Sequence, residues 1–308
     1  MTSAFAFAPF NTSYELRTPY LTVAEFNNTP NALDTANLLP GGPGPNQSQA
    51  LQEVISRASS WIDQYTCGAW GTLCSTAEVE NARVWGSYRN TLPVHPKYWP
   101  ITEVRAFSYS ALPGGLVSSN GASITPAGNI TVYPQMFEVA ITGIIAWGLN
   151  APAGIVRGCE YDTQYTYVCG WPNTTLAASV AAGATSIQPT TVNGIYPGTQ
   201  LSLNDLPNDE SVTVSSSYVA GASVVTLTSA LQYSHQTTAT VTNLPPAIKQ
   251  AAILATTAFI KIRGSGALEV ADMGMITHQT SGMPQGSGDD LYKAQCLLNP
   301  YRQTYVGW

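Results

Sequence analysis

The chain has 308 residues, of which 44% are hydrophobic and only 10% are charged, and its formal net charge is −6. Soluble domains usually carry about 25% charged residues, so uncharged polar residues make up most of the polar content here. The absence of a basic run argues against sequence-specific binding to nucleic-acid phosphates. The first residues do not resemble a secretory signal, and no apolar run reaches the roughly 18 residues of a membrane span. We therefore expect a soluble protein made in the cytoplasm.

The N-terminal part of the chain predicts an arm followed by two helices. Residues 1–20 carry no periodic pattern and are interpreted as an extended arm. Thr22 followed three residues later by Glu25 is a capping-box pattern, which opens a short helix. After a break rich in Pro and Gly at 39–45, apolar residues recur at helical spacing across 51–65 and predict a long amphipathic helix.

The middle of the chain predicts β-structure. From about residue 79 to 171 the apolar residues alternate with polar ones, which is typical of half-buried strands. The last of these segments places Tyr161, Tyr165 and Tyr167 on one face of a strand. Turn residues between the segments favour antiparallel connections.

Residues 173–243 differ in composition from the rest of the chain. They contain no Lys or Arg, and their charged residues are Asp205, Asp209 and Glu210. The segment AAGATSIQPTTV from Ala181 resembles VAGASVVTLTSA from Val219, each with a Gly turn before a strand-like run. Two similar β-units explain this pattern, and chance in a Thr- and Ala-rich segment is the other interpretation. We expect an inserted all-β module here, a sandwich or a roll.

The stretch PPAIKQAAILATTAFIKIRG, residues 245–264, predicts a helix that is apolar almost all the way round. Ile253, Leu254 and Ile260 lie outside its main apolar stripe, and we hypothesise that they face a neighbouring subunit. A final helix is expected in DDLYKAQCLLNPYR, residues 289–302, before a short aromatic tail.

Residue patterns that would indicate chemistry are missing from the sequence. The histidines His95, His235 and His278 are far apart, and none has a metal-ligand partner at the usual spacing. No nucleophile elbow, phosphate-binding loop or zinc-protease motif occurs. We therefore expect no catalytic residues, no metal and no cofactor, and we expect that the protein is not an enzyme.

The five cysteines allow two local disulfides, Cys67 with Cys74 and Cys159 with Cys169. Without a secretory signal, buried free thiols are the favoured interpretation.

These elements together predict an α+β fold. Its core would be a small, connector-like helical bundle formed by residues 21–172 and 244–308, which would also contain the antiparallel β region. The arm at 1–20 would precede this core, and the β-module at 173–243 would be inserted into it.

The order of the motifs resembles the head–tail connector proteins of long-tailed double-stranded DNA phages, also called adaptor or head-completion proteins. YLTVAEF opens a short helix, and Ala58, Ser59, Ile62 and Asp63 match the pattern of the long helix. Four residues of the later helix, and Leu297 to Arg302 at the end of the chain, match the remaining patterns. The resemblance covers about residues 20–110 and 244–302. The strands at about 111–171 and the insert have no counterpart in the family's basic pattern.

The resemblance implies a virion protein of the phage neck, assembled in the host cytoplasm. About twelve copies would form a homo-oligomeric ring on the portal protein, joined to a tail, stopper or terminator protein. DNA would pass through the ring without sequence-specific binding, and no membrane would be involved. The C-terminal tail would reach the portal, which assigns portal docking to Tyr301, Arg302, Tyr305 and Trp308. The insert is a candidate contact for the capsid.

A binding module of another kind is the alternative. A tail-fibre or surface protein with a carbohydrate-binding β-domain would fit the insert, with Trp70, Trp171 and the tyrosine-rich strand stacking on sugars. Burial of these aromatic residues in a core is the competing interpretation. A hydrolase with carboxylates distant in sequence is a third option, although no motif points to one.

Overall fold

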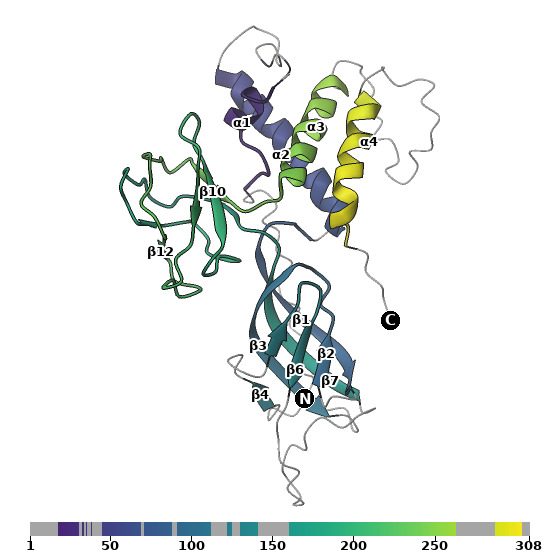
Figure 1. The fold of residues 1–308 in the computed structure, drawn as a ribbon. Coiled ribbons are helices and arrows are strands. Elements are labelled where there is room, and N and C mark those ends of the chain that lie inside the picture. Colours follow the sequence, from purple (N-terminus) through teal and green to yellow (C-terminus); the bar gives the residue numbers. More distant parts are fainter. Residues whose placement is uncertain are drawn as a thin grey trace, which may run out of the picture.

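The structure is a computed structural model that describes residues 18–30, 45–68, 71–87, 91–111, 122–124, 130–140, 160–262 and 287–303, with single residues at 33, 35 and 38. The helices gather at one end of the molecule, and two β-sheets form the opposite end (Figure 1). A separate β-module lies beside the helices. The chain therefore has three structural parts, two of which are built from strands.

Four helices and a short 3-10 turn form the helical part: α1 (Val23–Asn27), α2 (Pro45–Cys67), α3 (Pro246–Ile262), α4 (Ser287–Leu298) and η3 (Asn299–Tyr301). The predicted capping box at the start of α1 is confirmed, because Thr22 Oγ1 accepts the Glu25 N–H at 3.1 Å and the Glu25 carboxylate accepts the Thr22 N–H at 2.7 Å. Helix α3 lies between α2 and α4 (Figure 1). None of the helices in the described ranges has the length and apolar character needed to cross a membrane.

Two antiparallel sheets form the opposite end of the molecule. The first has the strand order β1-β7-β3-β4, and the second has the order β2-β6-β5. Their bounds are β1 (Thr76–Trp85), β2 (Thr91–Val94), β3 (Ile101–Ala111), β4 (Ala122–Ile124), β5 (Ile130–Val132), β6 (Phe137–Ala140) and β7 (Glu160–Cys169). Strand β7 is central, since it pairs with β1 along its whole length and with β3 on its other side.

Aromatic side chains fill the space between these sheets. Tyr161, Tyr165 and Tyr167 are buried on one face of β7, as the alternation in the sequence predicted. The ring of Tyr165 lies 5.2 Å from that of Phe137 on β6 and 6.4 Å from that of Phe107 on β3. Such ring pairs contribute about 0.5–1.5 kcal/mol each beyond the area that they bury. Aromatic side chains from both sheets therefore pack the two sheets together.

The expectation of a helical bundle as the core of the fold is wrong, because the described fold is mostly β. The four helices do not enclose a separate core. Leu51, Ile55 and Ile62 of α2 belong to the same hydrophobic cluster as Phe107 and Tyr165 of the sheets. The helices pack mainly on one another, and their apolar sides continue the hydrophobic cluster that begins between the sheets.

The segment 173–243 contains a second hydrophobic cluster. Its strands are β8 (Asn173–Thr175), β9 (Ser186–Ile187), β10 (Gln200–Asn204), β11 (Glu210–Thr213), β12 (Val225–Thr226) and β13 (Thr240–Thr242), in a four-stranded sheet of order β11-β10-β13-β8 and a two-stranded ladder of β9 and β12. Every residue of the second cluster lies between Leu176 and Val241. The strands of this segment begin at Asn173 and end at Thr242.

The sequence echo inside the module has a structural counterpart. Gly183 and Gly221, 38 positions apart, both adopt positive φ values, 84° and 89°. Backbone hydrogen bonds recur at the same offset. The bond from Ala177 N–H to Gln188 O corresponds to the one from Ser215 N–H to Thr226 O. The bond from Thr190 N–H to Thr175 O corresponds to the one from Thr228 N–H to Thr213 O. The equivalent residues Ile187 and Val225 pair directly with each other. The module therefore consists of two similar β-units related by a local two-fold arrangement.

The module is anchored to the first sheet by polar contacts. The Tyr196 hydroxyl lies 3.3 Å from both Thr102 Oγ1 and Glu103 Oε2 of β3. Arg105 of the same strand donates to Asn193 Oδ1 at 2.9 Å. These contacts give the module a defined orientation relative to the sheets.

The cysteines that the structure describes are not cross-linked. Cys67, Cys74 and Cys169 form no disulfide, and Cys67 and Cys169 are buried. The favoured interpretation of buried thiols outside disulfides is therefore confirmed for Cys67 and Cys169, whereas Cys74 is half-buried. Cys159 lies outside the described residues.

Candidate interaction site at the end of helix α2

The C-terminal segment returns to the end of α2 and is held there by hydrogen bonds. The Gln303 N–H donates to Thr66 O at 2.7 Å, and the Gln303 side chain donates to Trp99 O at 2.6 Å. The Tyr65 hydroxyl donates to Asn299 Oδ1 at 2.7 Å. The segment thus contacts both the helix and the loop that leads into β3.

Two of the predicted portal-docking residues belong to this segment. Tyr301 is half-buried, and its ring meets the ring of Trp171 edge-on at 5.5 Å. Arg302 is exposed, and its guanidinium lies 5.4 Å above the ring of Tyr65, a cation–π geometry. Tyr305 and Trp308 lie outside the described residues. Of the described pair, Arg302 is exposed beside α2, while Tyr301 joins the C-terminal segment to Trp171, two residues after β7.

An aromatic row continues from this point along α2. The rings of Trp61 and Tyr65 stack at 5.7 Å, one helical turn apart. Trp61 meets Phe259 of α3 edge-on at 6.4 Å. The row of Arg302, Tyr65, Trp61 and Phe259 therefore connects the C-terminal segment to the apolar helix.

A buried polar cluster lies beneath the same end of α2. The Tyr20 hydroxyl donates to Asp63 Oδ1 and lies 3.2 Å from Thr72 Oγ1. The Leu73 N–H lies 3.0 Å from the Tyr20 hydroxyl and 3.2 Å from Asp63 Oδ1. Burial, with the nearby Asp63 charge adding to it, raises the pKa of Tyr20 well above its ordinary value. Tyr20 therefore stays protonated and supplies the donor that the buried carboxylate needs.

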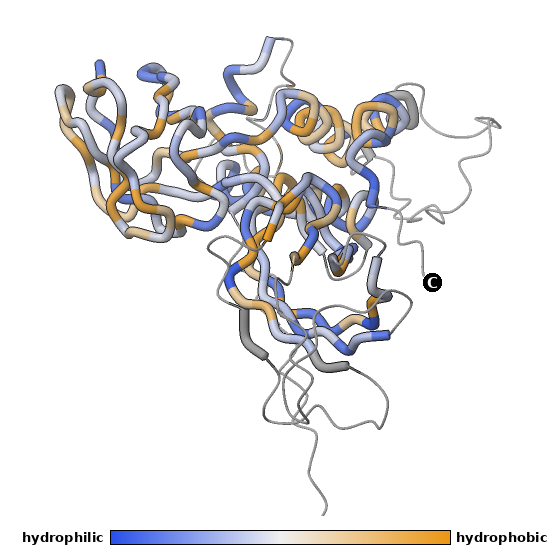
Figure 2. Tube along the Cα trace, turned by 60° about the horizontal axis from the view of Figure 1, so that its bottom comes forward, coloured by the Kyte–Doolittle hydropathy of each residue, from blue (hydrophilic) through white to orange (hydrophobic). Residues whose placement is uncertain are grey.

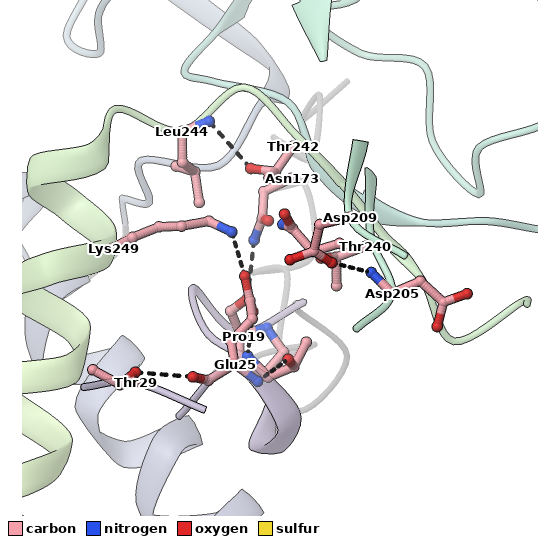
Figure 3. Close-up of polar contacts among 12 residues, drawn as sticks. Pro19, Glu25, Thr29, Asn173, Asp205, Asp209, Thr240, Thr242, Leu244 and Lys249 are labelled. Carbon is pink, nitrogen blue, oxygen red and sulfur yellow. Dashed lines mark hydrogen bonds and ion pairs between the residues drawn. The ribbon is translucent and has the colours of Figure 1, made fainter. Parts of the chain in front are cut away.

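The N-terminal segment is fixed to this cluster and to the β-module. The Tyr20 N–H donates to Ser59 Oγ at 3.1 Å. The Asn173 side chain, at the first residue of the module, donates to Thr18 O at 3.2 Å. It also donates to Pro19 O at 3.0 Å (Figure 3). Three distant parts of the chain consequently meet at the end of α2.

Helix α3 carries the three residues that were predicted to face a neighbouring subunit. Ile253, Leu254 and Ile260 are half-buried and pack against the main hydrophobic cluster of their own chain. Helix α4 covers part of α3, and Lys261 of α3 pairs with Asp290 of α4 at 2.6 Å. Their own chain therefore covers these three side chains only in part. The hydrophobic residues of the helices appear as orange segments in Figure 2.

The ionisable groups of the sheets are used to build the fold. Both oxygens of Glu80 accept hydrogen bonds, from the Tyr165 hydroxyl at 3.0 Å, the Tyr167 hydroxyl at 2.6 Å and the Lys97 N–H at 3.1 Å. This carboxylate connects β1, β7 and the loop before β3. In the parts of the chain that the structure covers, no group of three or more His, Cys, Asp or Glu residues is arranged to hold a metal ion.

The sequence motifs identified the residues that meet at the end of α2, but the sequence did not predict which residues they contact. The contacts of Trp171 with Tyr301 and of Gln303 with Thr66 were not predicted, because each joins positions more than a hundred residues apart. Tyr65 could have been singled out, since it lies one turn after Trp61 at the last turn of an aromatic helix face. No pattern in the sequence predicted that His235 is buried.

Comparison of the sequence with protein-family models and with curated proteins gives no match.

Proposed function

We propose that this chain is a structural virion protein, a head-to-tail adaptor whose copies form a ring between the portal and the tail components. The observation that carries the proposal is the meeting of the motif residues at one site. Tyr20 of the YLT motif, Asp63 of the long-helix motif and Tyr301 with Arg302 of the closing motif all lie at the end of α2. Each motif alone describes an amphipathic helix, so their convergence supports the proposal more than their sequences do.

The geometry of the C-terminal segment supports a docking role for the residues beyond it. Hydrogen bonds from Gln303 fix the chain at the junction of helices and sheets, so residues 304–308 start from a defined point. A short segment anchored at its base loses less conformational entropy on binding than a free one. This makes the last five residues and Arg302 suitable for contact with a portal.

The half-exposed side chains of α3 support contact with another copy. Ile253, Leu254 and Ile260 are incompletely covered by their own chain. In a head-to-tail ring each subunit offers two different surfaces to its neighbours. We assign one of these surfaces to this face of α3, and the net charge of −6 is compatible with DNA passing without tight binding.

The carbohydrate-binding alternative depends on free aromatic rings. Tyr161, Tyr165 and Tyr167 are buried in the core of the sheets, and Trp171 is engaged with Tyr301. Trp70 lies outside the described residues. No specific observation favours this alternative over the adaptor.

A truncation tests the docking role. Deletion of residues 304–308 keeps every described contact of the C-terminal segment, so we expect an unchanged thermal unfolding midpoint and loss of binding to the portal protein in a pull-down or by native mass spectrometry. Arg302→Ala should weaken binding while leaving the ring intact. Arg83→Ala, which removes an exposed arginine from β1 in the sheets, serves as a matched control with unchanged binding. Full portal binding by the truncated chain would contradict the assigned role.

A further inference from the structure

The ionisable residues of the β-module converge on one buried histidine. The module contains no Lys or Arg. Its histidine, His235, has a side chain that is 0% exposed, and its acids Asp205, Asp209 and Glu210 lie in or beside the turn between β10 and β11. Figure 3 shows Asp205 and Asp209 next to each other at this turn. The module thus keeps its acidic residues at a single place, around a side chain that water does not reach.

Both ring nitrogens of His235 face carboxylate oxygens. Nε2 lies 2.7 Å from Glu210 Oε1, and Nδ1 lies 3.6 Å from Asp205 Oδ2. At this spacing Nδ1 has no hydrogen-bond partner, although it is buried. Carboxylates are acceptors only, so each ring nitrogen needs a proton to interact favourably with its neighbour.

A neutral imidazole cannot meet this requirement. If the proton is on Nε2, the bare Nδ1 faces Asp205 as one acceptor facing another. If the proton is on Nδ1, the bare nitrogen is Nε2, and it faces Glu210 at only 2.7 Å. The doubly protonated ring has a donor on each side, so its Nε2–H donates to Glu210 and its Nδ1–H is attracted to the Asp205 carboxylate 3.6 Å away.

The carboxylates are themselves held in the position that this arrangement needs. Glu210 accepts the N–H groups of Gln232 at 2.9 Å and Tyr233 at 3.2 Å, and Asp205 accepts the Gln236 N–H at 3.0 Å. Burial alone would raise the pKa of Glu210, but hydrogen bonds from the Gln232 N–H, the His235 ring and the Tyr233 N–H outweigh it and lower that pKa. Glu210 is therefore ionised at neutral pH and demands a donor.

We propose that His235 is an imidazolium in the folded module, and that its second proton locks the β10–β11 turn to the segment 231–236. Asp205 and Glu210 lie at the two strand ends that the turn connects. His235 lies in a different segment, where it forms an antiparallel backbone bridge with Val180. Asp209 supports the lock indirectly, since it accepts the Asp205 N–H at 2.8 Å. Tyr233, whose N–H donates to Glu210, has an exposed side chain.

Nitrogen NMR on the full chain tests this assignment without disturbing the lock. The variant His95→Gln/His278→Gln retains every residue of the cluster and leaves His235 as its single histidine. With ¹⁵N-labelled histidine at pH 7, both ring nitrogens should resonate as protonated, as in an imidazolium. A spectrum with one bare ring nitrogen at pH 7 overturns the proposal.

Two further variants test the lock itself. Asp205→Asn in the single-histidine background gives Nδ1 an amide donor, so the ring should become neutral with its proton on Nε2; a persistent imidazolium would remove Asp205 from the lock. His235→Phe should accelerate hydrogen exchange of the Gln232 and Gln236 amides by about tenfold or more, as expected for loss of a charge-assisted bond. Unchanged exchange would show that the ring does not hold the turn. Should this variant fail to fold, the NMR result still decides the proposal.

Discussion

Tyr20→Phe is the most informative perturbation of the helical part, because it removes one hydroxyl from a buried charge. Asp63 is only 5% exposed, and its carboxylate accepts from the Tyr20 hydroxyl and the Leu73 N–H. Losing a hydrogen bond to a charged group costs about 1.5–3 kcal/mol, and a buried carboxylate left short of a donor places the cost at the upper end. We therefore expect a loss of about 3 kcal/mol in the free energy of unfolding.

Urea denaturation followed by far-ultraviolet circular dichroism measures this loss. Tyr65→Phe is the control, since it deletes a hydroxyl whose partner, Asn299, is exposed; it should change the free energy of unfolding by less than about 0.5 kcal/mol. Adding Asp63→Asn to Tyr20→Phe removes the buried charge and should restore about 1 kcal/mol. A cost below about 0.5 kcal/mol for Tyr20→Phe would refute the reasoning.

Three other outcomes follow from the structure. Replacing residues 173–243 by a Gly/Ser linker should leave a remainder that still unfolds cooperatively on heating; loss of all tertiary structure would show that the segment is not a module. Burial raises the pKa of Cys169 to about 12, so at pH 8 about one Cys169 thiol in ten thousand is ionised. Iodoacetamide should therefore modify the exposed Cys296 in the folded protein, and Cys169 only after unfolding. Peptide mass spectrometry reads both modifications. Gly170→Ala should lower the free energy of unfolding in urea by more than about 2 kcal/mol, because the new Cβ would lie 2.6 Å from a backbone oxygen. Gly183→Ala, at a similar φ but in open space, should lower it by about 1 kcal/mol. Equal losses would contradict the packing argument.

Local patterns in the sequence predicted the local structure well. The capping box at Thr22 and the long helix after the Pro- and Gly-rich break are present. The alternating segments became strands, and the tyrosines of β7 are buried as their spacing indicated. These features depend on side chains within about two turns or one strand of each other, so the sequence contains the information directly.

The fold class was mispredicted for a physical reason. Helix α3 is apolar almost all round, which suggested a helical core, yet the hydrophobic cluster that it belongs to continues into sheet residues far away in the sequence. Strand β7 pairs with β1, about 85 residues earlier, and no local pattern encodes that partnership. The environment of His235 has the same origin, because Glu210 is 25 positions away along the chain.

Electron microscopy of the purified chain mixed with the portal protein that the proposal implies tests the adaptor proposal most directly. The account predicts closed rings of about twelve copies seated on the portal, with the C-terminal segment at the contact. A chain that remains monomeric, leaves the portal bare and instead binds a glycan array would contradict the account.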